Sequence, residues 1–408
     1  MTLVQTPAHT DRSTSPVWFG ILAVAYGAYS AIHSALLGFL LRNQGVPVER
    51  IAGVVALGML PLTWSFALAP LVDLGRRRRN WVIGGFLLAA ACVWPVVSWT
   101  GSSLTLRTTL LVWAGVGTTI GTTALNALMT EFSPLLRGRV GGWWQAGNVG
   151  GGALGGGLML WLAQRLSGSL LATAVCAVLL APVLAVFAVH EQPHAQSAVP
   201  IFARFAELIG GLREFLKSRR TYAGLLFFVG PMGTSGAVFS ALAADFHASG
   251  NEVVWITGVG AGLIAVVGSL IGGWVADRVG KAWANILGGV MLAACAATLA
   301  ASRLSPVSFG VGVLSYQLLI GFGYAAYTAL LLEVIGGRRA IAATGYSALN
   351  SVGNVPPVYM TALAGQAYKH VGPRGPMAFD AIANLAGAAA LTGLVIWAAR
   401  RKNQWDLT

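Results

Sequence analysis

The feature that most constrains this chain is a series of twelve long apolar segments. Each holds about 20 mostly apolar residues, enough to cross the hydrocarbon core of a bilayer. Only 10% of the 408 residues are charged, against about 25% in a typical soluble domain. Backbone amides find no water in lipid, so the segments must be helices. We therefore predict an all-α membrane protein with transmembrane helices at about 17–41, 50–73, 81–99, 107–131, 140–163, 168–189, 222–246, 252–276, 281–302, 306–335, 340–366 and 377–400.

An internal repeat relates the two halves of the chain. Asp73 and Asp277 each end an apolar segment and are followed by Gly and basic residues. A second pair, 127–131 and 329–333, ends in Glu, and a third, 147–149 and 353–355, reads Gly-Asn-Val in both copies. The three pairs occur in the same order, at offsets of 202 to 206 residues. Two pseudo-symmetric six-helix halves are the plan of many membrane transporters.

The distribution of Lys and Arg predicts the topology. With the N-terminus in the cytoplasm, 19 of the 26 basic residues fall on the cytoplasmic side and 7 on the opposite side. This bias predicts a multi-pass protein of the cell inner (plasma) membrane with both termini cytoplasmic. It also explains the net charge of +13 without a nucleic-acid partner, since the basic residues form no separate soluble domain.

Residues 190–221 form the one long polar stretch and contain apolar positions at helical spacing. They predict a linker with an amphipathic helix on the cytoplasmic surface, the alternative being a regulatory binding site. The resulting divisions are an N-terminal tail at 1–16, a first half at 17–189, the linker at 190–221, a second half at 222–400 and a C-terminal tail at 401–408.

The segments 66–79 and 273–281 resemble the G-x-x-x-D-R-x-G-R-R signature of the major facilitator superfamily. The second copy is close to the signature, whereas the first has Ala69 in place of the first Gly. Within the superfamily, 66–81, 138–156 and 343–351 resemble the branch with the AmpG muropeptide permeases, acetyl-CoA transporters and siderophore permeases. That branch tends to carry two acids in the fourth helix, where this chain has Thr122 and Asn126.

The acidic residues at the helix ends predict a charge network. In the superfamily such networks hold the inner gate closed while the outer side is open. The alternative is a static cap on the helix ends that also serves as a topology signal. We predict this network at Asp73 and Glu131 with the basic run Arg76 to Arg79, of which Arg76 and Arg77 are singled out, and at Asp277, Arg278 and Glu333 in the second half.

The resemblance also implies a substrate site near the midplane, lined by the first, fourth, seventh and tenth helices with help from the fifth and eleventh. Its polar and aromatic residues predict a neutral-to-polar cavity, suited to sugar-like or amide-containing solutes. His33, the ionisable residue placed in mid-helix, is the candidate for a proton-linked step, or else a neutral hydrogen-bonding group. The predicted site residues are Tyr26, Tyr29, His33, Thr122, Asn126, Gln145, Asn148, Ser235, Phe239, Gln317, Tyr324, Tyr327, Asn350 and Asn354.

No catalytic constellation, cofactor motif or metal-ligand spacing is visible, so we expect a carrier and not an enzyme. The Gly runs at 150–152 and 155–157 lack the Lys-Ser/Thr pair of a phosphate-binding loop. The predicted function is an AmpG-like secondary active transporter for a muropeptide or a comparable metabolite such as a siderophore. Alternatives are a drug or metabolite exporter and a non-transporting membrane sensor or assembly factor. The expected partners are a small-molecule substrate, the lipid bilayer and protons, and we expect a monomer.

Overall fold

The computed structural model describes residues 14–46, 48–74, 77–99, 101, 103–191, 201–231, 239, 242–336 and 338–400, and these residues are overwhelmingly helical. No strand occurs among them. The helical elements are α1 (Val17–Ala31), η1 (Ile32–Leu36), α2 (Leu37–Asn43), α3 (Val48–Thr63), α4 (Ser65–Leu74), α5 (Arg78–Ser98), α6 (Leu104–Met129), η2 (Pro134–Leu136), α7 (Arg137–Ala163), α8 (Gly168–Leu180), η3 (Ala181–Ala188), α9 (Ile201–Lys217), α10 (Arg219–Phe228), α12 (Gly250–Val253), η5 (Val254–Gly260), α13 (Ala261–Val279), α14 (Lys281–Ala301), α15 (Pro306–Ile335), η6 (Arg339–Ile341), α16 (Ala342–Gly353), α17 (Val355–Val371) and α18 (Gly375–Arg400).

These elements follow the predicted apolar segments, and the all-α membrane fold is confirmed. Within the described residues, seven helices are long and apolar enough to cross a membrane. They become eight if α3 and α4, bent by 44° around Trp64, form one span. Pro61 lies inside α3, three residues before this break.

Other predicted segments are also interrupted. The first contains the π-helical turn η1, and the eleventh breaks at Asn354, where Pro356 and Pro357 open α17. In the seventh segment, predicted at 222–246, residues 232–238 and 240–241 lie outside the described residues. Its helix α10 ends at Phe228, and Pro231, which has no N–H to donate, follows two residues after the cap residue Val229.

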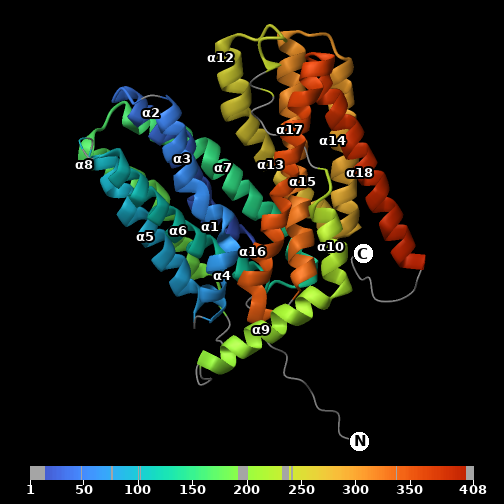
Figure 1. Ribbon diagram of the computed structural model, residues 1–408, viewed down its shortest axis with the longest axis horizontal. Coiled ribbons are helices and arrows are strands. Elements are labelled where there is room, and N and C mark those ends of the chain that lie inside the picture. The colour runs from blue at the N-terminus through green and yellow to red at the C-terminus, as the bar shows by residue number, and fades with distance from the viewer. Residues whose placement is uncertain are drawn as a thin grey trace, which may run out of the picture.

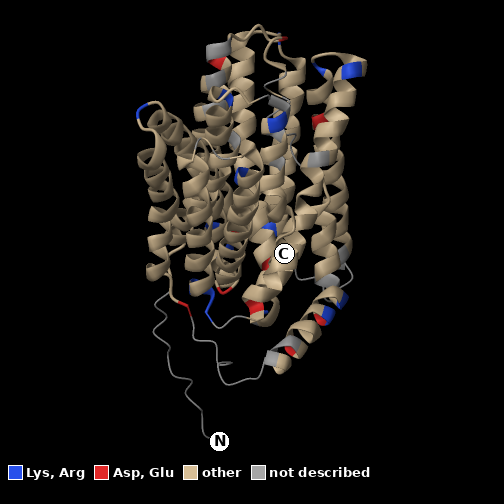
Figure 2. Ribbon diagram, turned by 60° about the vertical axis from the view of Figure 1, so that its left-hand side comes forward, with Lys and Arg blue, Asp and Glu red and all other residues tan. Residues whose placement is uncertain are grey.

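Two helical bundles form the molecule (Figure 1). The first, α1 to η3, and the second, α10 to α18, converge at the end where α9 lies and diverge at the other end. We call these the α9 end and the open end. The charged residues lie mostly towards the helix ends, with long uncharged stretches of ribbon between them (Figure 2).

Close backbone packing joins the two bundles at the α9 end, where α7 of the first packs on α13 of the second. A Cβ atom on Gly142 would lie 2.8 Å from the backbone oxygen of Ser269, and one on Gly273 would lie 2.8 Å from the Cα of Gly142. Small residues let membrane helices approach this closely. The Gly-rich fifth segment, α7, therefore lies between the two bundles along this stretch.

The linker helix α9 lies across the end of this junction (Figure 1), packed against α4 of the first bundle and η6 of the second. Among its described side chains, Leu208 and Phe215 are buried, and Phe202 and Leu216 are exposed. The predicted amphipathic helix therefore has two apolar faces, and one of them packs on the protein.

Candidate functional site

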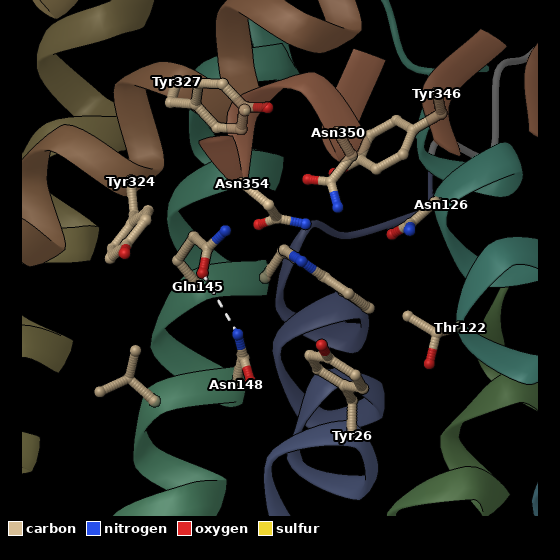
Figure 3. A pocket seen from close by; sticks show the side chains of 13 residues that line it. Tyr26, Thr122, Asn126, Gln145, Asn148, Tyr324, Tyr327, Tyr346, Asn350 and Asn354 are labelled. Atoms are coloured by element: carbon tan, nitrogen blue, oxygen red, sulfur yellow. Dashed lines mark hydrogen bonds between the residues drawn. The ribbon is translucent and has the colours of Figure 1, made fainter. Parts of the chain in front are cut away.

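A cavity of about 290 Å³ lies where the two bundles meet, between helices α1, α6 and α7 of the first and α15 and α16 of the second. None of its lining residues, all within the described part of the chain, is charged. The polar groups are amides, phenols, one hydroxyl and the indole N–H of Trp144, and Figure 3 shows the labelled side chains around a common space. The lining residues are Tyr26, Thr122, Asn126, Trp144, Gln145, Asn148, Val149, Tyr324, Tyr327, Tyr346, Asn350, Gly353 and Asn354.

Part of the cavity wall is held by hydrogen bonds. The Gln145 amide donates to the hydroxyl of Thr328 across the two bundles, with 2.9 Å between Nε2 and Oγ1. Asn148 donates to Gln145 Oε1 at 3.4 Å (Figure 3). The phenol of Tyr327 donates to the backbone oxygen of Leu349 at 3.4 Å. These contacts orient one side of the cavity before any solute enters.

Another side of the cavity has polar atoms without hydrogen-bond partners. Thr122 is 9% exposed and Asn126 is 8% exposed, and they lie one turn apart on α6. Neither Thr122 Oγ1 nor Asn126 Oδ1 has a hydrogen-bond partner among the described residues. A buried polar atom left unpaired costs about 1–3 kcal/mol, so a solute that pairs with these atoms recovers that free energy.

An aromatic surface borders the same space. The rings of Tyr26 and Trp144 lie nearly parallel, with centroids 6.3 Å apart and an interplanar angle of 16°. Aromatic faces attract the C–H groups of apolar or sugar-like ring faces, while the amides and hydroxyls around them pair with polar substituents. The cavity therefore suits a solute that has both kinds of surface.

The structure brings nine of the predicted site residues into this lining. Tyr29 and His33 lie outside it, packed against each other at 3.4 Å between Oη and Nε2. Both are fully buried, and a Cβ atom on Gly58 would meet His33 Nε2 at 2.5 Å. The π-helical turn η1, in which His33 lies, departs from regular helical geometry. The residues in the lining are Tyr26, Thr122, Asn126, Gln145, Asn148, Tyr324, Tyr327, Asn350 and Asn354.

The other predicted residues lie elsewhere. Phe239 is buried against the Tyr316 ring, with centroids 4.7 Å apart, in an apolar cluster of the second bundle. Gln317 on α15 is half-buried and does not line the cavity. Ser235 lies outside the described residues. The sequence reasoning missed Trp144 and Tyr346, although Tyr346 falls within the motif 343–351 that carries the family resemblance.

The α9 end is closed by two carboxylates that each cap a helix of the opposite bundle. Asp73, at the end of α4, accepts hydrogen bonds from the backbone N–H groups of Ala343 and Thr344 at 2.9 and 2.8 Å. The Thr344 hydroxyl donates to the same carboxylate at 2.8 Å. These N–H groups belong to the first turn of α16, where a helix lacks internal acceptors and favours negative charge.

Asp277 repeats the arrangement in the second bundle. It accepts from the N–H groups of Gly138 and Arg139, in the first turn of α7, at 2.6 and 2.9 Å. The Lys281 ammonium donates to the backbone oxygen of Pro134 at 2.7 Å, which also joins the bundles. Asp73 and Asp277 are thus equivalent positions of the internal repeat in structure as well as in sequence.

The basic partners agree only in part with those singled out from the sequence. Arg78, 2% exposed, pairs with Glu131 at 2.8 Å and lies 4.0 Å from Asp73. Arg78, the first residue of α5, is buried, whereas its neighbour Arg77 is exposed. Arg76 lies outside the described residues.

Glu333 of the second bundle pairs with Arg137 of the first bundle at 2.7 Å. The Arg278 guanidinium instead lies 4.0 Å from the centroid of the Trp274 ring. Glu191 was not predicted, yet it accepts from the N–H groups of Arg78 and Arg79 at 2.6 and 3.3 Å. It caps α5 as the two aspartates cap α16 and α7.

The two bundles, the shared cavity between them and the matched caps define a multi-pass membrane carrier. Residues 17–355 match the family model of the Major Facilitator Superfamily. The chain belongs to this superfamily, and it is a membrane transporter.

Solved structures support the same fold. The human organic anion transporter MFSD10 (TETRAN) superposes with a TM-score of 0.66 and 18% identity, covering 92% of this chain and 98% of its own. The proton:xylose symporter XylE, bound to 6-bromo-6-deoxy-D-glucose, gives 0.62 and 14%, covering 93% and 94%. FucP in the outward conformation gives 0.61 and 15%, covering 91% and 98%. No curated protein matches the chain in sequence.

Proposed function

We propose that this protein is a secondary transporter that carries a small, neutral, polar solute by alternating access. The observation behind the proposal is the pair of buried polar atoms, Thr122 Oγ1 and Asn126 Oδ1, that face an uncharged cavity between the bundles without partners. Such atoms discriminate strongly for a solute that supplies the missing hydrogen bonds. A polyhydroxylated or amide-bearing solute with one apolar ring face fits this lining.

The gate supports the transport cycle. Asp73 and Asp277 hold the two bundles together at the α9 end, so we expect the solute to enter the cavity from the opposite end in this state. For the solute to leave at the α9 end, the carboxylates must withdraw from the first turns of α16 and α7. Binding therefore has to favour the state in which the bundles separate there, since a ligand shifts an equilibrium only by its differential affinity for two states.

The resemblance to the AmpG branch suggests a muropeptide or a siderophore, and this stays a proposal. The cavity volume lies at the low end of ligand pockets, which run from about 300 to 1,000 Å³. A muropeptide is larger and carries carboxylates, for which the lining offers no basic side chain. The geometry therefore favours a smaller neutral solute, whether the protein imports or exports it. A non-transporting sensor would bind such a solute without moving it.

The test combines transport and binding by the purified protein. Liposomes are assayed with neutral hexoses, polyols and N-acetylated sugars, beside muropeptides and ferric siderophores. For the solute that is carried, Asn126→Ala and Thr122→Val should each weaken binding about 3- to 10-fold, the value of one neutral hydrogen bond. Thr109→Val is the matched control, because Thr109 is an exposed hydroxyl on the same helix.

Two results would contradict the proposal. Binding that is unchanged in both variants would remove the cavity as the solute site. Binding without flux in liposomes would favour the sensor. We further propose that the protein lies in the inner (plasma) membrane with cytoplasmic termini, on the strength of the charge bias in the sequence.

A further inference from the structure

The second bundle contains a carboxyl group that takes no part in the cavity or the gate. Asp380 is the sixth residue of α18, about 8 Å along the helix from its start at the open end. Its side chain is 0% exposed. A carboxyl group inside a membrane-spanning helix is costly to keep and marks a functional site by default. Asp380 falls within the predicted transmembrane segment 377–400, so this intramembrane carboxyl group could have been singled out from the sequence.

The contacts of Asp380 tie two helices together. The Tyr316 phenol of α15, also 0% exposed, donates to Asp380 Oδ2 at 2.5 Å. Asn384, one turn later on α18, donates to the backbone oxygen of Asp380 at 2.9 Å. Its own Oδ1 is buried without a hydrogen-bond partner. Phe239 packs edge-on against the Tyr316 ring, which keeps this bond within the apolar cluster.

Among the described residues, Tyr316 of α15 donates to Asp380, and Cys295 of α14 lies close enough to interact with it electrostatically. On α17, which also packs on α18, Tyr359 donates to the backbone oxygen of Val229 and Tyr368 to Asp245. Lys369 and His370 are exposed at the end of α17. Residues 232–238 and 240–241, which the structure does not describe, contain no Lys, Arg, His, Asp or Glu.

We propose that Asp380 is a proton-binding site whose ionisation sets the strength of the α15–α18 contact. The inference rests on the proposed transport function and names the proton as its coupling ion. A hydrogen bond to an ionised acceptor is roughly twice as strong as a neutral one. Protonation of Asp380 therefore loosens the bond from Tyr316. The same helix, α15, carries Tyr324 and Tyr327 into the cavity, so its position links the proton to the solute.

The experiment separates proton coupling from transport itself. Wild type and Asp380→Asn are compared in liposomes for solute exchange at equal pH and for uptake driven by an inward proton gradient. Exchange should persist in Asp380→Asn, and the gradient-driven component should be lost. Infrared difference spectra of the purified protein should show a carboxylic-acid C=O band that titrates with pH in wild type and is absent from the variant.

Further variants guard against misfolding. Tyr316→Phe keeps the ring and removes the donor, and it should move the midpoint of the pH dependence to higher pH. Asp245→Asn is the matched control, because Asp245 accepts from Tyr368 at 3.1 Å in an exposed position, and it should respond to the gradient as wild type does. His33→Gln should do the same if the proton site is Asp380.

The proposal is overturned if Asp380→Asn responds to the gradient as strongly as wild type, or if wild-type uptake ignores the gradient while exchange proceeds. The latter result leaves the transport function intact. Absence of both exchange and uptake in wild type would remove the transport function. In that case the infrared titration still decides whether Asp380 binds a proton, and the lack of a titrating band in wild type refutes it.

Discussion

At the scale of single residues, the gate depends on carboxylates that serve the opposite bundle. Asp73 and Asp277 lie near the C-terminal ends of α4 and α13. They nevertheless accept hydrogen bonds from the first turns of α16 and α7 in the opposite bundle. A helix N-terminus carries about half a positive charge. Each contact thus stabilises the closed α9 end through a group that loses its partner when the bundles separate.

Neutralising Asp277 should shift this balance. Asp277→Asn keeps an acceptor oxygen but loses the charge, which is worth about 1–2 kcal/mol at a partly buried helix terminus. The closed α9 end should become roughly tenfold less favoured, and transport should fall while abundance in the membrane stays near normal. Arg278→Gln is the control, since Arg278 stacks on Trp274 and should tolerate the change. Equal losses of abundance and transport would indicate a purely structural cap.

The acids of this network could be predicted from the sequence, whereas their partners could not. Acidic residues are scarce in an apolar chain and recur at matched positions, so Asp73, Glu131, Asp277 and Glu333 stand out. The choice of Arg78 over its neighbours depends on where α5 begins. The pairing of Glu333 with Arg137 depends on which helices of opposite bundles meet. Neither is encoded in local spacing.

At the scale of helices, α7 shows how glycine sets the geometry of the gate. It packs on α1 of its own bundle and on α13 and α15 of the other. Gly142 and Gly273 permit the cross-bundle approach, because any side chain there would meet backbone atoms. The equivalent of Gly273 in the first repeat is Ala69, which is fully buried. This departure from the family signature shows that the α4 position accommodates one more carbon.

A methyl group at Gly273 should therefore hinder closure of the α9 end. Overpacking typically costs about 1–3 kcal/mol, and at this position it destabilises only the closed state. Gly273→Ala should reduce transport several-fold. Gly157→Ala on α7 should have little effect, since nothing lies within 4 Å of its added carbon. The measurements are flux in liposomes and thermal stability in detergent. Equal behaviour of the two variants would contradict the role of Gly273 in closure.

At the scale of the whole molecule, the apolar segments and the internal repeat were sufficient to predict the fold. Part of the cavity lining could be predicted from the sequence, because polar residues on interior helices are few. Tyr29 and His33 share a helix with Tyr26 but pack within the first bundle. The conformational state could not be predicted, since one sequence must support closure at either end. The contacts of Asp73 and Asp277 define the present state as closed at the α9 end.

The closed end and the charge bias together predict how the molecule sits in the membrane. Single cysteines replace exposed residues at the open end (Gln44, Glu252) and at the α9 end (Arg77, Lys217), in a chain whose three native cysteines are changed to Ala. In intact cells, an impermeant maleimide should label the open-end positions only. Because the cavity is closed towards α9, Asn148→Cys should also react from outside, and the transported solute should protect it. Labelling of Arg77→Cys or Lys217→Cys from outside would reverse the topology, and an unreactive Asn148→Cys would place the barrier at the open end instead.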